Sequence, residues 1–438
     1  MFLFVIFFTS TLFIKLILAY FLPLLPDEAY YWMWSHHLQL GYFDHPGMIA
    51  WLFRLGHFLE PFGHAVRWPA ICINHLNYIF WFYIFKELKI SPTHFYSWFL
   101  LTFISPILGF GSILLTPDLP IMLFWSSSLY FFIRILKSKD LINYCFLGMS
   151  LGLGFLSKYH IVLFLIIGFF YLSVEKKWRF ISSKGTILTF IFGFIFSFPT
   201  IYWNYQNDFQ SFAFQINHGL QASSWKWQWP IEFLIGHSIL LFPVFVFYFF
   251  KSQLSEQQRI LKYFSAGVLM FFFFTSFRSS VEMNWTILAF PAFYSVVLLS
   301  DISFLYLRRI KLFFVFFNLI LLALMFNGVY PHGKIFEPFF FSSQKNVHSE
   351  FSPLYGINYQ TSASLWYFSK IKTLKVPRAS RYDFFDTFPI DFKNFPSVFY
   401  VFKEITNEYP DWLLEMKPTI TVAKKLERNY VIEKVVIK

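Results

Sequence analysis

Long apolar runs separated by short polar segments dominate this chain. About eleven runs are long enough, or nearly so, to cross roughly 30 Å of hydrocarbon as helices. The first, Phe2–Leu25, lacks a basic leader and a small-residue cleavage site, so we expect a retained first helix. The other predicted spans are Trp68–Phe85, Phe95–Leu115, Leu119–Leu136, Leu141–Leu156, Tyr159–Val174, Thr186–Tyr202, Ile231–Phe250, Leu261–Phe277, Trp285–Ser300 and Leu312–Tyr330.

Basic residues cluster in every second connection between these runs. Because Lys and Arg accumulate in cytoplasmic loops, the alternation predicts a cytoplasmic N-terminus and, after an odd number of crossings, a tail outside the cytoplasm. The pattern holds around Lys158 only if the chain turns there near the outer surface. The basic connections contain Lys86, Lys89, Arg134, Lys137, Lys139, Lys176, Lys177, Arg179, Lys184, Lys251, Arg259, Lys262, Arg308, Arg309 and Lys311.

The chain changes character after Tyr330. Residues 331–438 hold no apolar run of span length and are mixed in charge. We therefore predict two domains, a transmembrane domain over 1–330 and an extracytoplasmic soluble domain over 331–438, which is within the usual domain size range. Alternating stretches at Pro396–Phe402 and Tyr430–Ile437 predict strands, and hence a small α+β fold.

Composition indicates a polytopic α-helical membrane protein. Hydrophobic residues make up 57% of the chain and charged residues 14%, against roughly 25% charged in soluble domains. The net charge of +12 could indicate a nucleic-acid partner, but the positive-inside rule already explains the short basic clusters. We therefore expect no nucleic-acid partner. The partners that composition implies are membrane lipids.

A cluster of polar residues follows the first apolar run. It reads Pro26-Asp27-Glu28-Ala29-Tyr30-Tyr31-Trp32 and then Gly41-Tyr42-Phe43-Asp44-His45-Pro46. Carboxylates and a histidine beside a membrane boundary are costly to keep, which favours a role in chemistry at one membrane face. The chain lacks a Gly-rich phosphate loop, an H-E-x-x-H helix, a C-x-x-C pair and a G-x-S-x-G elbow. Carboxylates and isolated cations remain, and these suit proton abstraction and stabilisation of a leaving phosphate.

These outer-loop segments, together with Leu115-Thr116-Pro117-Asp118, Leu156-Ser157-Lys158-Tyr159 and Val281-Glu282-Met283-Asn284-Trp285, resemble those of bacterial dolichyl-phosphate-mannose-protein mannosyltransferase-like membrane proteins. That family belongs to the C-type glycosyltransferase superfamily, with the aminoarabinose transferases that modify lipid A. In the tail, Tyr359-Gln360 and Arg381-Tyr382-Asp383 are similar to the outer domain of the bacterial subgroup.

The resemblance implies a C-type glycosyltransferase fold in the bacterial inner membrane. The implied donor is a polyprenyl-phosphate sugar, and the acceptor a hydroxyl of lipid A, another glycan or a protein. By resemblance Asp27 is the candidate base, with Asp44 and Asp118 as further catalytic candidates. We expect Lys158 and Arg278 to bind the donor phosphate, and Glu28, His45 and Glu282 to contact the acceptor or support the site.

Each of these residues has a structural alternative. Asp27 suits the N-cap of a helix beginning at Ala29, and Asp118, after Pro117, suits another helix start. Glu28 could complement a helix dipole, and Asp44 and His45 could form a turn before Pro46.

The cations have alternatives as well. Lys158 could extend its ammonium group to the membrane interface, and Arg278 could pair with Glu282. No cofactor is required for departure of a lipid phosphate, although Asp27 and Asp118 leave room for a divalent cation. A transporter or flippase of lipid-linked sugars, or a non-catalytic assembly subunit, stays open as a different function.

Overall fold

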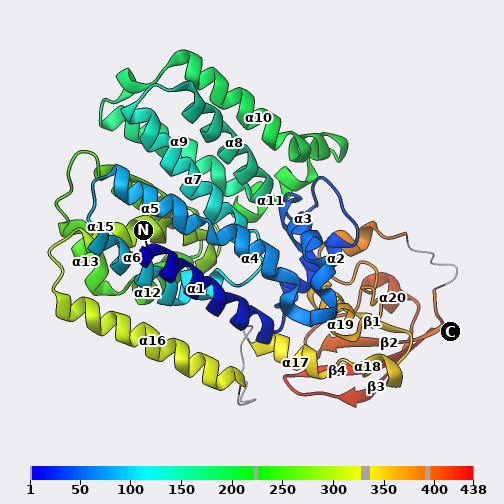
Figure 1. The fold of residues 1–438 in the computed structure, drawn as a ribbon. Coiled ribbons are helices and arrows are strands. Elements are labelled where there is room, and N and C mark those ends of the chain that lie inside the picture. The colour runs from blue at the N-terminus through cyan, green and yellow to red at the C-terminus, as the bar shows by residue number, and fades with distance from the viewer. Residues whose placement is uncertain (1, 221–224, 327–335, 390–394, 438) are drawn as a thin grey trace. The chain divides into compact units, whose positions relative to one another are not determined.

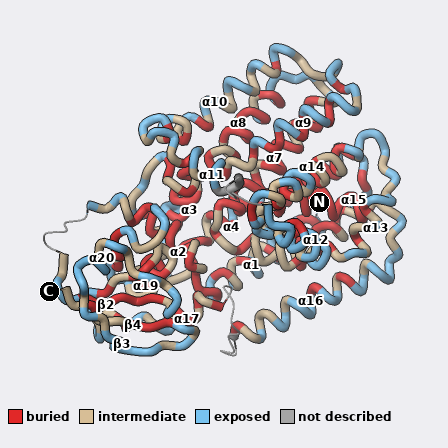
Figure 2. Tube along the Cα trace, turned by 180° about the vertical axis from the view of Figure 1, so that it is seen from behind, coloured by how far each residue is buried: buried red, intermediate tan, exposed pale blue. Residues whose placement is uncertain are grey.

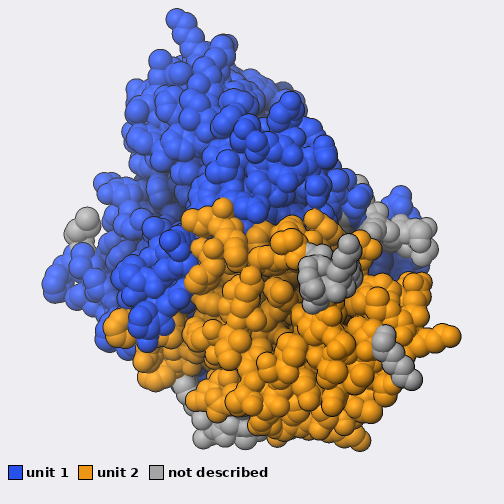
Figure 3. Space-filling model, turned by 90° about the vertical axis from the view of Figure 1, so that its right-hand side faces the viewer, with its two compact units in different colours: residues 1–19, 39–61, 65–322 blue, residues 20–38, 62–64, 323–438 orange. Residues whose placement is uncertain are grey.

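The computed structural model describes residues 2–220, 225–326, 336–389 and 395–437, and is mainly helical. The chain forms two compact units (Figure 3). Unit 1 contains residues 1–19, 39–61 and 65–322, and unit 2 contains residues 20–38, 62–64 and 323–438. The predicted domain boundary at residue 330 lies outside the described residues. Residues 20–38 belong to the same unit as the C-terminal part of the chain.

Unit 1 is a bundle of helices (Figure 1). Each predicted apolar run falls, as far as the described residues go, on one helix or on a broken pair of helices. The elements are α1 (Phe2–Phe21), α3 (Met48–Leu55), η1 (His57–Arg67), α4 (Trp68–His75), α5 (Asn77–Glu87), α6 (Pro92–Ile104), η2 (Pro106–Phe110), α7 (Asp118–Lys137), α8 (Leu141–Ser157), η3 (Tyr159–Ile161), α9 (Val162–Val174), η4 (Trp178–Phe180), α10 (Ser183–Gln206), α11 (Gln210–Leu220), α12 (Gln228–Leu241), α13 (Pro243–Lys251), α14 (Arg259–Thr275), η5 (Met283–Ala289), α15 (Phe290–Leu298) and α16 (Phe304–Phe326).

The bundle differs from the prediction because several of the expected continuous spans are broken into two shorter helices. Among the described residues, three helices are long and apolar enough to cross a membrane alone, namely α1, α7 and α10. Helices α12 and α13 make a fourth candidate if taken together, although the pair bends by 86° at Phe242. Pro106 and Pro243 begin the second helix of a broken pair, because proline lacks the amide that a continuing helix needs. The count of eleven spans stays a prediction.

Two glycines let α8 approach α10 closely. A Cβ atom added at Gly148 would lie 2.4 Å from the carbonyl oxygen of Thr189, and one at Gly152 would lie 2.6 Å from that of Gly193. Small residues four apart permit this close backbone packing between membrane helices. The contact fixes α8, whose last residue, Ser157, directly precedes Lys158.

Burial in unit 1 is greatest on the inner helices. All nine residues of α15 are buried, whereas most residues of α16 are exposed, as Figure 2 shows. Exposed phenylalanine and leucine side chains on α1, α10 and α16 are the expected surface of a protein whose solvent is lipid.

Unit 2 contains a four-stranded sheet. The strands β1 (Leu354–Gly356), β2 (Val398–Glu404), β3 (Thr419–Lys425) and β4 (Tyr430–Val436) pair in the order β1-β2-β4-β3 (Figure 1). β1 pairs parallel to β2, and the other two pairings are antiparallel. Strands β2 and β4 confirm the two predicted strands. The helices of the unit are α2 (Pro26–Ser35), α17 (Glu337–Ser343), α18 (Val347–Glu350), α19 (Tyr359–Ser369), η7 (Phe384–Thr387) and α20 (Asp411–Glu415).

A buried charge cluster stabilises unit 2. The Lys375 ammonium lies 2.6 Å from a carboxylate oxygen of Asp383 and 2.6 Å from one of Asp386. The side chains of Lys375 and Asp383 are almost fully buried. Burial raises the pKa of Asp383 to about 6, even though Lys375 favours its charged form.

We expect Lys375→Met to destabilise unit 2 by about 3–5 kcal/mol, because two carboxylates would lose their buried counter-charge. Without Lys375 the pKa of Asp383 should lie above about 6, so the variant protonates Asp383 at a higher pH than the parent does, and the loss should shrink as the pH falls toward about 6. Amide hydrogen exchange in β2 and β4 of the full-length protein measures the effect.

The matched control is Lys424→Met. Lys424 forms an exposed ion pair with Glu350 at 2.7 Å, a type of pair that contributes about 0–1 kcal/mol. Equal acceleration of exchange in the two variants would contradict a stabilising role for the buried cluster.

Candidate active site

Three segments of unit 1 meet at Asp118. The carboxylate oxygen Oδ1 accepts a hydrogen bond from Lys158 Nζ at 2.7 Å, and Oδ2 accepts one from Asn284 Nδ2 at 2.8 Å. Asp118 begins α7, Lys158 follows α8, and Asn284 lies in η5. Asp118 and Lys158 are each 6% exposed, so this is a buried ion pair.

This arrangement gives Asp118 a role other than capping. Its side chain forms no cap of α7 and instead bonds two side chains from distant segments. Because both carboxylate oxygens accept hydrogen bonds from N–H donors, Asp118 is suited to an ion pair and not to binding a metal ion. A lysine ammonium has three N–H donors, so Lys158 retains donors for a further acceptor.

Backbone contacts close the loop of unit 1 that contains Asp44. The Tyr42 amide donates to the carbonyl oxygen of His45 at 3.0 Å, and Gly41 and Pro46 form an isolated β-bridge. Gln215 of α11 donates from Nε2 to the backbone carbonyl of Asp44. Asp44 is 4% exposed and His45 is half-buried. The turn expected at these residues is present, and it holds a buried carboxylate.

Asp27 lies in unit 2, in the first turn of α2. Its oxygen Oδ1 accepts hydrogen bonds from Gln360 Nε2 at 2.9 Å and from the Tyr359 hydroxyl at 3.3 Å, both on α19. No hydrogen bond from the residues that the structure describes reaches Oδ2. The side chain is half-buried. One oxygen is therefore held, and the other can accept a proton.

The capping alternative for Asp27 is wrong. Helix α2 begins at Pro26, three residues before the expected start, and its N-cap is Leu25. Glu28 completes this helix start, because its Oε2 accepts a hydrogen bond from the Leu25 amide at 3.0 Å. Glu28 is fully buried.

Aromatic residues support α2 within unit 2. The Tyr30 hydroxyl accepts a hydrogen bond from the Phe384 amide at 2.8 Å, and the Tyr30 ring lies 4.6 Å from that of Tyr359. Arg381 lies over the Tyr359 ring at 4.7 Å. The tail segments around Tyr359 and Arg381 thus surround the helix that carries Asp27.

The remaining predicted residues are exposed. Arg278 and Glu282 both lie on the surface of unit 1, and among the described residues no ion pair joins them. Arg278 instead lies over the ring of Trp225 at 5.3 Å.

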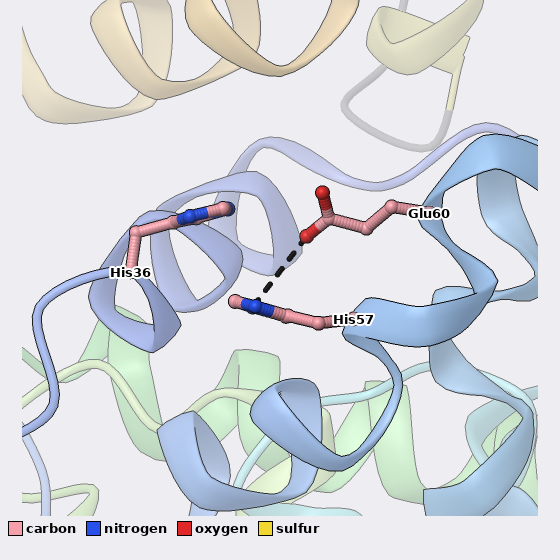
Figure 4. A group of neighbouring side chains, drawn as sticks. All are labelled: His36, His57 and Glu60. Carbon is pink, nitrogen blue, oxygen red and sulfur yellow. Dashed lines mark ion pairs between the residues drawn. The ribbon is translucent and has the colours of Figure 1, made fainter.

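A histidine–carboxylate pair that was not predicted lies in η1. His57 Nε2 is 3.5 Å from Glu60 Oε1 (Figure 4). Arg54 Nη1 is 2.8 Å from His57 Nδ1. Figure 4 also shows His36, which belongs to unit 2.

Two residue groups were missed as partners. Asn284 stands inside the segment Val281–Trp285, and Tyr359 and Gln360 stand together in the tail, but their roles depend on carboxylates far away in the sequence. The resemblance of both segments to the family was the signal available in the sequence, and it gave no indication of which carboxylate each residue would contact.

Comparison with known proteins agrees with the sequence motifs. Residues 44–203 match the PMT_2 family, dolichyl-phosphate-mannose-protein mannosyltransferase. The predicted resemblance is confirmed. The matched PMT_2 segment contains Asp44, Asp118 and Lys158 of unit 1.

Two solved structures share the fold. ArnT from Cupriavidus metallidurans bound to undecaprenyl phosphate matches with a TM-score of 0.65 and 14% identity, over 98% of this chain and 98% of that one. The apo form of ArnT matches with a TM-score of 0.64 and 14% identity, over 98% of this chain and 97% of that one. This chain therefore shares the fold of these two ArnT structures.

The curated relatives match this chain over only part of their length. Lipid A galacturonosyltransferase RgtD of Rhizobium johnstonii is 22% identical over 61% of this chain and 58% of its own. An uncharacterized protein of Aquifex aeolicus is 28% identical over 56% of this chain and 58% of its own. The chain thus spans less than two thirds of the length of these relatives.

Proposed function

We propose that this protein is a glycosyltransferase of the bacterial inner membrane. It transfers a sugar from a polyprenyl-phosphate donor to a hydroxyl of lipid A, another glycan or a protein, at the extracytoplasmic face. Three findings support the proposal, namely the PMT_2 segment, the fold shared with an ArnT bound to undecaprenyl phosphate, and the similarity to a lipid A galacturonosyltransferase.

The proposed mechanism rests on the hydrogen bonding of the Asp27 carboxylate. Gln360 and Tyr359 fix one oxygen, and the other has no hydrogen-bond donor among the described residues. A general base needs this combination of a fixed orientation and an open oxygen. We assign Asp27 as the base that takes the proton of the acceptor hydroxyl, and Gln360 and Tyr359 as residues that position it.

The proposed reaction is a single displacement. The acceptor oxygen forms a bond to the anomeric carbon while the bond from that carbon to the donor phosphate oxygen breaks. The acceptor proton passes to Asp27, and the lipid leaves as a phosphate monoester. One displacement inverts the configuration at the anomeric carbon.

Cations of unit 1 would balance the leaving charge. Lys158 and Arg278 are assigned to the donor phosphate, and Asp118 orients Lys158 through the buried ion pair. Asp44, His45, Glu28 and Glu282 remain candidates for supporting the acceptor side. No step of this reaction requires a metal ion, and a divalent cation at Asp118 would have to displace Lys158 or Asn284.

The topology proposed for the protein has about eleven spans, a cytoplasmic N-terminus and an extracytoplasmic soluble domain. Several residues of the basic connections do meet in unit 1. Arg134 and Lys137 both pair with Glu87 at 2.9 Å, and Arg259 pairs with Glu175 at 2.6 Å. This clustering supports one shared membrane face for these connections.

The first prediction concerns chemistry. Asp27→Asn keeps the shape and the hydrogen bond from Gln360, but the amide cannot take a proton, so turnover should fall by roughly 10² or more while expression and membrane insertion persist. Mass spectrometry of envelope glycolipids and glycoproteins, from cells carrying either form, identifies the transferred sugar and measures its loss.

Asp411→Asn is the matched control. Asp411 also follows a proline in the first turn of a helix of unit 2, but its side chain is exposed. Near-normal sugar transfer with Asp27→Asn would remove Asp27 from the mechanism. Sugar modification that is lost equally in both variants would point to folding and not to proton transfer.

The second prediction concerns the donor. Arg278→Ala should raise the KM for the lipid-linked donor by roughly 10- to 150-fold, the effect of losing one charge-assisted hydrogen bond, with kcat less affected. The control is Lys226→Ala, because Lys226 likewise lies over a tryptophan ring, that of Trp229 at 5.2 Å. An equal rise in KM for both variants would argue against a specific phosphate contact.

The third prediction concerns topology. A cysteine at position 177 should resist a membrane-impermeant thiol reagent added to intact cells, and one at position 226 should react. The reason is that Lys177 lies in a basic connection and Lys226 in an alternate one. Reaction at position 177 from outside would reverse the proposed orientation.

A further inference from the structure

Helices α6 and α16 run side by side in unit 1. Lys311 Nζ donates to the Ser97 hydroxyl at 2.6 Å, and Asn318 Nδ2 donates to the carbonyl oxygen of Ile104 at 2.7 Å. Each bond joins residues 214 apart, and the two bonds are separated by seven residues on either helix. Seven residues are about two turns, so the helices are parallel, and both begin at the same end.

A groove of about 620 Å³ lies along this helix pair. Near the helix starts the lining contains the polar residues Thr93, His94, Ser97, Arg308 and Lys311, beside the apolar Phe304 and Leu307 of the first turn of α16. Farther along, the lining is apolar and includes Leu100, Ile104, Leu312 and Val315. From Thr93 to Ile104 the groove follows α6 for roughly 16 Å.

The charge at the polar end is positive and unbalanced. The lining contains Arg308 and Lys311 and no carboxylate. In the described part of the chain neither cation forms an ion pair, and the partner of Lys311 is a neutral hydroxyl. Both helices also direct the positive ends of their dipoles toward this end. A lone anion with an apolar extension is the ligand that such a groove fits.

We propose that this groove binds one anionic glycerophospholipid. Its phosphate lies against Arg308 and Lys311, and one acyl chain follows Leu100, Ile104, Leu312 and Val315. Basic pockets between membrane helices bind anionic lipid headgroups in this way. The site does not depend on the proposed transferase activity, and no residue of the proposed mechanism lines it.

The alternative explanation is that these cations only set membrane topology. The chain offers a direct comparison, because Arg309 adjoins Arg308, is equally exposed and does not line the groove. A topology signal would treat the two arginines alike. A binding site would depend on Arg308 and not on Arg309.

Native mass spectrometry of the delipidated full-length protein tests the proposal. The probes are phosphatidylglycerol and phosphatidylcholine with identical acyl chains. We expect retention of one phosphatidylglycerol and at least fivefold weaker retention of phosphatidylcholine. Arg308→Gln and Lys311→Gln should each reduce phosphatidylglycerol retention about fivefold. Arg309→Gln should leave it unchanged.

A second variant tests the groove without changing its charge. Leu100→Trp fills the apolar part of the groove while both cations remain, and it should also reduce retention. Equal retention of the two phospholipids, or an equal effect of Arg308→Gln and Arg309→Gln, would overturn the proposal.

Discussion

The ion pair between Lys158 and Asp118 is the interaction on which the inner part of unit 1 depends. A charge in an apolar interior is costly unless a partner of opposite sign and further hydrogen bonds compensate it. Asp118 obtains both from Lys158 and Asn284, which come from two other segments of the chain. The start of α7, the end of α8 and the beginning of η5 are thereby held to one another. The glycine contacts of α8 with α10 extend this fixed geometry to a fourth helix.

In unit 2, hydrogen bonds from α19 hold the half-buried carboxylate of Asp27. Helix α19 contacts β1 of the sheet, and α2 packs on α19 with Tyr30, Tyr359 and Phe385 close together. Asp27 thus lies on a helix whose start is fixed by Glu28 and whose side is fixed by aromatic rings. Loops seldom provide such precision, and placing the group on a supported helix makes its orientation a property of the fold.

Local signals in the sequence predicted a large part of this structure. Each apolar run gave a helix, and the alternating stretches gave β2 and β4, because these patterns report burial along one element. The breaks at Ser105 and Phe242, and the early start of α2, depend on packing that no local pattern encodes. Strand β3 was missed because most of its residues are exposed, and β1 because it has only three residues. For the site, the motifs located the charged residues but not their pairing, since Asp118 meets Asn284 across 166 positions.

Unit 2 is built from segments that are far apart in the sequence, and this has a consequence for biogenesis. Asp27 is synthesised 333 positions before its partner Gln360. At the usual 5–20 residues per second, translation separates the two by roughly 20 to 70 seconds. During that interval α2 has no partner helix, and the intervening hydrophobic segments are synthesised. The support around this carboxylate is therefore completed only after all the intervening segments have been made, which ties its final geometry to their synthesis.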